Sequence, residues 1–89
     1  MIEPPKKQWN FVAVLRIEKQ GRGGKTVTVI DGLPKTEPFL KETTRTLKNK
    51  CGSGGTYSMA GREGVIEIQG DKRELIRAYF AAEGVKTKG

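Results

Sequence analysis

The sequence contains no histidine and a single cysteine among its 89 residues. Because histidine is the commonest general base and the commonest metal ligand, its absence excludes Ser-His and Cys-His nucleophiles and removes the usual donor of a metal site. One cysteine, Cys51, can form no intramolecular disulfide and no thiolate cluster. We therefore expect no metal, no cofactor and a reducing, cytoplasmic environment.

Long apolar segments are also missing. No apolar run approaches the ~20 residues of a membrane span. Residues 1–7 carry two prolines and two lysines and lack the apolar stretch that a signal peptide needs. We expect a protein that is neither secreted nor bound to a membrane.

The residues left for acid, base or nucleophilic chemistry each have a simpler structural interpretation. Cys51 falls on the apolar stripe of an expected helix, where a buried cysteine is usually inert packing. Asp31 ends an expected strand before Gly32, and Asp71 stands where a helix should begin. No catalytic constellation remains, so we predict that the protein is not an enzyme.

Two glycine-rich segments resemble nucleotide-binding motifs, but neither matches the pattern that such a motif requires. Gly24, Lys25 and Thr26 resemble the end of a Walker phosphate loop, but Lys19 stands where the first glycine is required, and a strand instead of a helix follows. Residues 52–55 lack the preceding strand and following helix of a dinucleotide fingerprint. We interpret them as a flexible connection.

The chain does have an excess of positive charge. Seventeen Lys and Arg residues against ten Asp and Glu give a net charge of +7, which is typical of proteins whose partner is a polyanion. Many small proteins are basic without binding nucleic acid, so the location of the charges must decide.

The hydrophobic pattern predicts a single domain over residues 11–89 after a flexible tail over residues 1–10, since a chain of this length can bury only one core. Alternating β-branched segments predict strands, and apolar residues every three or four positions predict helices. The expected strands lie at residues 11–18, 26–31, 56–59, 65–69 and 85–88, and the expected helices at residues 36–51 and 71–83. This β-β-α-β-β-α-β order predicts an α+β fold, a two-layer sandwich with two helices on one face of a mixed sheet.

Helical spacing also predicts which side chains face the core. The inner faces are expected to carry Leu40, Thr44, Leu47 and Cys51 in the first helix and Leu75, Ile76, Tyr79 and Phe80 in the second. Thr36 is expected to cap the first helix, and Asp71 with Glu74 to form a capping box at the second.

The segment between the first two strands is the strongest candidate for binding. It reads Lys19, Gln20, Gly21, Arg22, Gly23, Gly24 and Lys25, with three cations, three glycines and no acid. Glycines let the main chain approach phosphates closely, an arginine can make bidentate phosphate contacts, and lysines add point charge. The alternative is a solvated hairpin whose cations guard an edge against aggregation.

A second basic cluster joins the two helices. It comprises Arg45, Lys48 and Lys50 on the polar side of the first helix, with Lys72 and Arg73 at the start of the second. The dipole alone explains cations in the last turn of a helix, whereas Lys72 and Arg73 stand at the unfavourable end. With only Trp9 and Tyr57 expected outside the core, base stacking is not the expected main mode, and contact with the RNA backbone is favoured.

Three longer segments carry a family resemblance. They are Arg16-Ile-Glu-Lys-Gln-Gly-Arg-Gly-Gly-Lys25, Lys48-Asn-Lys-Cys-Gly-Ser-Gly-Gly-Thr56 and Val65-Ile-Glu-Ile-Gln-Gly-Asp-Lys-Arg73. Together they resemble the family of the eukaryotic initiation factor that inspects start codons, and more closely its bacterial YciH-type relatives. The resemblance covers residues 14–88 and implies a two-layer sandwich of a mixed sheet and two helices.

The resemblance also implies a role in translation initiation. It implies binding of a monomer near the decoding site of the small ribosomal subunit, where Lys19, Arg22 and Lys25 approach ribosomal RNA and the initiator tRNA or mRNA and disfavour wrong codon pairing. Two alternatives stay open from the residues alone. One is a generic RNA-binding or RNA-chaperone module, and the other is a protein-interaction domain that uses the exposed sheet.

Overall fold

The computed structural model describes residues 11–21 and 23–89, so Arg22 and the tail expected over residues 1–10, including Trp9, lie outside the described residues. The elements are β1 (Val12–Gln20), β2 (Lys25–Leu33), α1 (Glu37–Cys51), β3 (Gly55–Ser58), β4 (Gly64–Gln69), α2 (Arg73–Ala82) and β5 (Lys86–Lys88). They confirm the expected β-β-α-β-β-α-β order and the α+β class.

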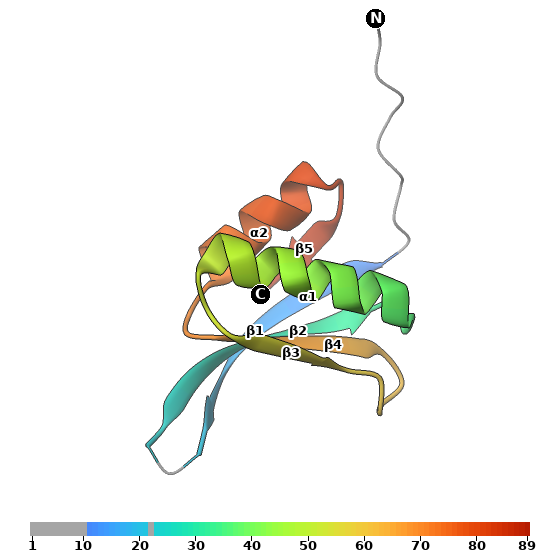
Figure 1. Cartoon of the computed structure of the whole chain (residues 1–89). Helices are drawn as coiled ribbons and strands as arrows, with labels where there is room; N and C mark the ends of the chain where they lie inside the picture. The colour runs from blue at the N-terminus through green and yellow to red at the C-terminus, as the bar shows by residue number, and fades with distance from the viewer. Residues whose placement is uncertain (1–10, 22) are drawn as a thin grey trace, which may run out of the picture.

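All five strands belong to one sheet, in the order β3-β4-β2-β1-β5 (Figure 1). β5 pairs with β1 in parallel, whereas the other three pairs are antiparallel. The sheet is therefore mixed, as expected. Both helices cover the same face of it (Figure 1), and the second layer of the sandwich is thus formed by α1 and α2.

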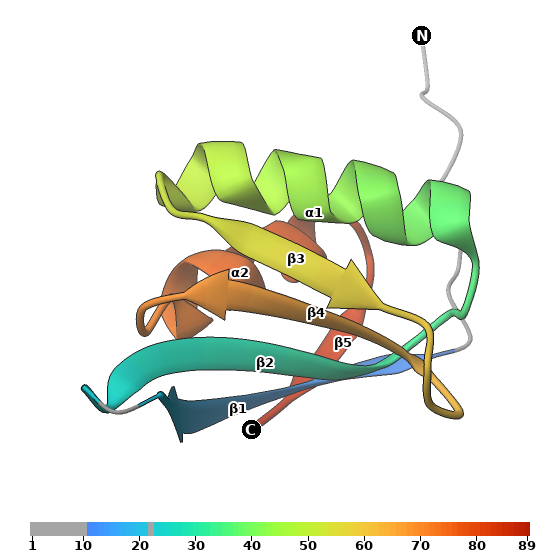
Figure 2. The same ribbon diagram turned by 60° about the horizontal axis from the view of Figure 1, so that its bottom comes forward.

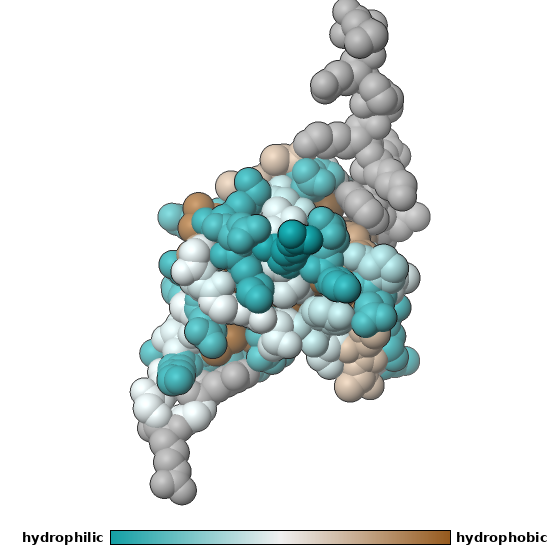
Figure 3. Space-filling view, viewed as in Figure 1, coloured by the Kyte–Doolittle hydropathy of each residue, from teal (hydrophilic) through white to brown (hydrophobic). Residues whose placement is uncertain are grey.

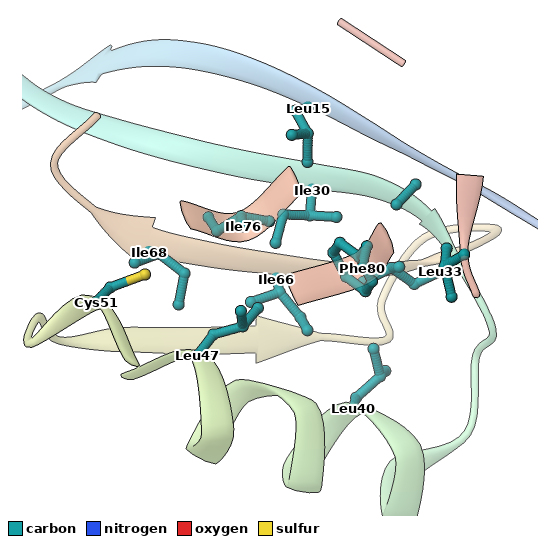
Figure 4. Close-up of a cluster of buried hydrophobic side chains, with 12 residues drawn as sticks. Leu15, Ile30, Leu33, Leu40, Leu47, Cys51, Ile66, Ile68, Ile76 and Phe80 are labelled. Carbon is teal, nitrogen blue, oxygen red and sulfur yellow. The ribbon is translucent and has the colours of Figure 1, made fainter. Parts of the chain in front are cut away.

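The core lies between the helices and the sheet (Figure 4). Its members are buried apolar side chains from three strands (β1, β2 and β4), both helices and the loop before β5. They are Ala13, Leu15, Ile30, Leu33, Leu40, Leu47, Cys51, Ile66, Ile68, Ile76, Phe80 and Val85. Ile66 and Ile68 share one face of β4, as the period of two in a strand requires. Burial of Cys51 at 7% exposure confirms the predicted helix phase, and its sulfur is directed toward Ile68 (Figure 4).

The opposite face of the sheet carries valines covered by charged side chains. Val29 is only 1% exposed although it does not belong to the cluster between the helices and the sheet, and its neighbours across the sheet are Arg16 and Glu67. The Arg16 Nε donates to Asp31 Oδ2 at 2.6 Å, and its guanidinium also pairs with Glu18. An ion-paired layer thus shields this face, which weakens the case for an apolar protein-docking surface.

Several expected boundaries were wrong by one or two residues. β1 continues to Gln20 and β2 begins at Lys25, so the expected seven-residue loop shrinks to residues 21–24. α2 begins at Arg73 with Lys72 as its N-cap, and its helical run ends at Ala82. The reason for the longer hairpin is that ladder pairing continues through polar residues, which hydrophobic alternation does not reveal.

The expected caps and one expected core residue also differ. Thr36 is the N-cap of α1, but its side chain makes no capping hydrogen bond. The capping box of Asp71 and Glu74 was wrong, because the Asp71 carboxylate lies against the Arg73 guanidinium. Leu75 is 50% exposed, since Ile76 and Phe80 alone supply the buried stripe of this short helix. Neither described helix is long and apolar enough to cross a membrane.

Candidate nucleic-acid interface

The β1–β2 hairpin ends in a tight glycine turn. The Gly24 N–H donates to Gly21 O at 3.2 Å, and both glycines have positive φ angles, 76° for Gly21 and 63° for Gly24. Such angles strain residues that have a Cβ atom. The turn therefore explains two of the three glycines of the segment, Gly21 and Gly24, before any ligand is considered.

The predicted binding residues of this segment are divided between turn and strands. Lys19 and Lys25 lie on the strands and are exposed, as are Gly23 and Gly24 in the turn. The Lys19 Nζ donates to Thr26 Oγ1 at 3.2 Å across the ladder, while Gln20 is the register partner of Lys25. The hairpin projects from the body of the protein (Figure 1), so its cations are presented on an extended arm.

The base of this arm is fixed to the segment that precedes α2. The Gly70 N–H donates to Thr26 O at 2.8 Å, and the Thr28 hydroxyl donates to Gly70 O at 2.6 Å. The same hydroxyl accepts a hydrogen bond from the Lys72 N–H at 2.9 Å. The two predicted basic clusters are thus held on one frame, and Figures 1 and 2 show the hairpin, the start of α2 and the end of α1 at the same end of the molecule.

The exposed side of α1 supplies the helix part of the second cluster. Arg45 and Lys48 are exposed, and Lys41 joins them at a spacing of four and seven positions, which places all three on one side of the helix. Hydrophilic side chains gather over this surface (Figure 3). The sequence analysis did not include Lys41 in the interface. Its spacing of four positions from Arg45 could have indicated that the two side chains lie on the same side of the helix.

Lys72 and Arg73 are not free, fully solvated cations. Arg73 donates through Nε to Asp71 Oδ1 and through Nη2 to Asp71 Oδ2, both at 3.0 Å. The hydrogen bonds with Arg73 hold the pKa of Asp71 below its usual range. Lys72 is half-buried, and its charge lowers the pKa of Cys51, although burial raises that pKa more strongly. Lys72 therefore lies close to the end of α1.

The chemistry available at this surface is recognition of anions. Within residues 11–21 and 23–89, no group of three His, Cys, Asp or Glu side chains is placed to hold a metal ion. Fixed cations on an arm and a helix can neutralise phosphates of a nucleic acid backbone. Thr28 was missed by sequence reasoning, and no local signal could have found it, because its partners are 42 and 44 residues away.

Comparison with known proteins identifies relatives of this chain. Residues 12–86 match the family described as translation initiation factor SUI1. The chain is 46% identical over 77 residues to the uncharacterized protein YciH of Salmonella typhimurium, covering 84% of this chain and 68% of the relative. It is 41% identical over 81 residues to the protein translation factor SUI1 homolog of Picrophilus torridus, covering 89% and 76%. The corresponding homolog of Sulfurisphaera tokodaii is 39% identical over 78 residues, covering 88% and 72%.

Proposed function

Because the chain belongs to the SUI1 family of translation initiation factors, we propose that it binds the small ribosomal subunit near the decoding site and acts in initiation without catalysing a reaction. The observation that carries this proposal is that the basic hairpin, the end of α1, which carries Lys48, and the start of α2 lie at one end of the molecule (Figure 2). The chain has a net charge of +7, and cations gathered at one end suit the ribosomal RNA backbone.

The proposed interface has a rigid part and a projecting part. The Lys72 N–H donates to Thr28 Oγ1 and Thr26 O accepts from the Gly70 N–H, so both residues are anchored to one frame, while Lys19 and Lys25 lie on the strands of the hairpin. A pre-shaped interface spends little of its binding free energy on ordering. The projecting arm would reach ribosomal RNA and the initiator tRNA or mRNA of the initiation complex, while the helices dock on the subunit body.

Fidelity in start-site or initiator tRNA selection follows from differential binding. A factor that binds an open or mismatched initiation complex more tightly than a correct one shifts the population toward rejection of the mismatch, in proportion to the ratio of the two affinities. No acid, base or nucleophile is needed for this effect. The second candidate, a generic RNA-binding or RNA-chaperone module, would use the same cations without such a preference.

The experiment that tests the proposal is nucleotide-resolution footprinting of the protein on purified small subunits, with excess non-ribosomal RNA as competitor. We expect a compact set of protected ribosomal RNA nucleotides near the decoding site that persists in the competitor. Protections that scatter over the subunit, or vanish when competitor is added, would identify a generic RNA-binding module. ATP and GTP included in the same reactions should remain unhydrolysed.

A further inference from the structure

A second feature of α1 is a groove between this helix and the edge strand β3. It has a volume of about 260 Å³, and α1 and β3 lie side by side in both ribbon views (Figures 1 and 2). Its lining residues are Lys41, Thr44, Arg45, Lys48, Gly55, Thr56 and Tyr57. Whole small-molecule ligands generally occupy about 300–1,000 Å³, so this groove suits one unit of a longer chain better than a complete free ligand.

The charge of the groove selects an anion. Three cations, Lys41, Arg45 and Lys48, line it, and within residues 11–21 and 23–89 no hydrogen bond or ion pair engages their charged side-chain groups. Like charges four positions apart on a helix repel one another. A bound phosphate would relieve this repulsion.

The close approach of helix and strand depends on Gly55. A Cβ atom at this position would lie 2.6 Å from Ile68 Cδ1, 2.9 Å from Glu67 O and 3.3 Å from Lys48 Cγ. Only glycine therefore permits this packing, which draws the aliphatic part of Lys48 over the edge strand. The groove is thus a built feature of the fold.

Tyr57 forms an aromatic wall of the groove. Its hydroxyl donates to Glu37 Oε2 at 3.2 Å, and this bond ties the ring between β3 and the first turn of α1. Burial, and then the hydrogen bond to Glu37, raise the pKa of Tyr57. The hydrogen bond to Glu37 holds the ring beside α1, as a stacking platform for a base requires.

The groove also offers unused hydrogen-bonding groups. The Gln69 N–H donates to Gly54 O, and the alternation of an antiparallel ladder then turns the main-chain groups of Gly55 and Tyr57 toward the free edge of β3. In addition, the Thr44 hydroxyl has no hydrogen-bond partner among the described residues.

We propose that this groove binds one unpaired nucleotide of an RNA, with the base against Tyr57 and the flanking phosphates on the cations of α1. The base edge pairs with the free main-chain groups of β3. A regular duplex cannot enter, because its bases are stacked and paired inside the helix. The inference rests on the proposed function and sharpens it, since it states which ribosomal RNA feature α1 recognises.

The test uses two RNA hairpins that differ in one feature. In the first, a single uridine bulges from the stem, and in the second an inserted adenine pairs with that uridine. We expect the wild-type protein to bind the bulged hairpin about tenfold more tightly, the size of one base–aromatic stacking contribution. Tyr57→Leu should abolish this preference, whereas Tyr79→Leu, the matched change of the other tyrosine, should keep it.

A second measurement guards against misfolding of the Tyr57→Leu variant. The amide resonances of Gly55 and Tyr57 in the wild-type protein should shift with the bulged hairpin and stay in place with the paired one. Equal affinity for both hairpins, or a preference that survives Tyr57→Leu, would overturn the groove assignment. If small subunits still bind in that case, the proposed function stands, whereas loss of binding to subunits and hairpins alike would remove both.

Discussion

Lys72 and Thr28 are joined by a hydrogen bond across 44 positions of the chain, in which the Lys72 N–H donates to Thr28 Oγ1 at 2.9 Å. Thr28 is fully buried and its hydroxyl also donates to Gly70 O at 2.6 Å. One side chain in the sheet thus holds the start of α2, with Lys72 and Arg73, beside the base of the basic hairpin.

Thr28→Val tests whether this hydroxyl positions the interface. The change keeps the shape of the side chain but leaves the Gly70 carbonyl and the Lys72 N–H without their partner, which should lower the free energy of unfolding by about 2 kcal/mol. RNA affinity should also fall, because Lys72 and Arg73 lose their fixed place. Urea denaturation and binding to a fluorescent RNA measure the two effects.

Thr26→Val provides the control for that variant. Among the described residues, the Thr26 hydroxyl accepts a single side-chain hydrogen bond, from the exposed Lys19 Nζ, so its loss should change stability by less than about 0.5 kcal/mol. Equal destabilisation by the two valine variants would show that the link between Thr28 and Lys72 has no special role.

Asp71→Asn should increase RNA affinity. The Asp71 carboxylate holds the Arg73 guanidinium through two hydrogen bonds of 3.0 Å, so its removal frees a cation at the proposed interface. We expect affinity to rise roughly threefold, in keeping with the small energies of exposed ion pairs. Glu74→Gln removes a neighbouring negative charge without freeing Arg73, and an equal gain in both variants would mean that only net charge matters.

Cys51 should react slowly with a thiol reagent in the native protein. Its side chain is buried in the core, and burial raises the pKa of the thiol, so both access and the thiolate fraction are low. In urea the reaction should be fast. Equal rates in the native and unfolded protein would contradict the core placement of this residue.

The same pKa shift predicts a loss of stability at alkaline pH. Because the folded-state pKa of Cys51 is raised, the unfolded chain releases the thiol proton first, near pH 8.5. The contribution is therefore complete below that pH and is lost as pH rises through the folded pKa. Urea titrations at pH 7 and 9.5 should show a larger decrease for the wild type than for Cys51→Ala, and parallel decreases would refute the assignment.

Local pattern in the sequence was sufficient to predict the element order, the class and most of the core, because these follow from periodicity. Leu40, Leu47, Ile66 and Phe80 are all buried as predicted. Leu75 is exposed instead, because the packing of α2 against the sheet decides how many residues of the helix are buried, and this packing cannot be predicted from helical spacing alone. Boundaries of the hairpin were also missed, since polar ladder residues such as Lys19 and Gln20 give no alternation signal.

The candidate site was predictable only in part, because the contacts of its residues depend on tertiary structure. Clusters of Lys and Arg are visible in the sequence, but their partners are set by tertiary structure, as the pairing of Arg73 with Asp71 shows. The groove beside Lys41 depends on the approach of α1 to β3 over Gly55. Contacts of this kind join residues distant in the chain and leave no local trace.

The central claim is that charge on the hairpin carries binding to the small subunit, and the salt dependence of affinity tests it most directly. Arg22→Glu with Lys25→Glu should weaken subunit binding strongly and flatten the plot of log affinity against log salt by about one to two units. Lys86→Glu with Lys88→Glu makes the same charge change on β5, which pairs with residues 12–14 at the far end of β1, and should alter the slope little. A hairpin variant that binds subunits like the wild type, with an unchanged slope, would contradict the account.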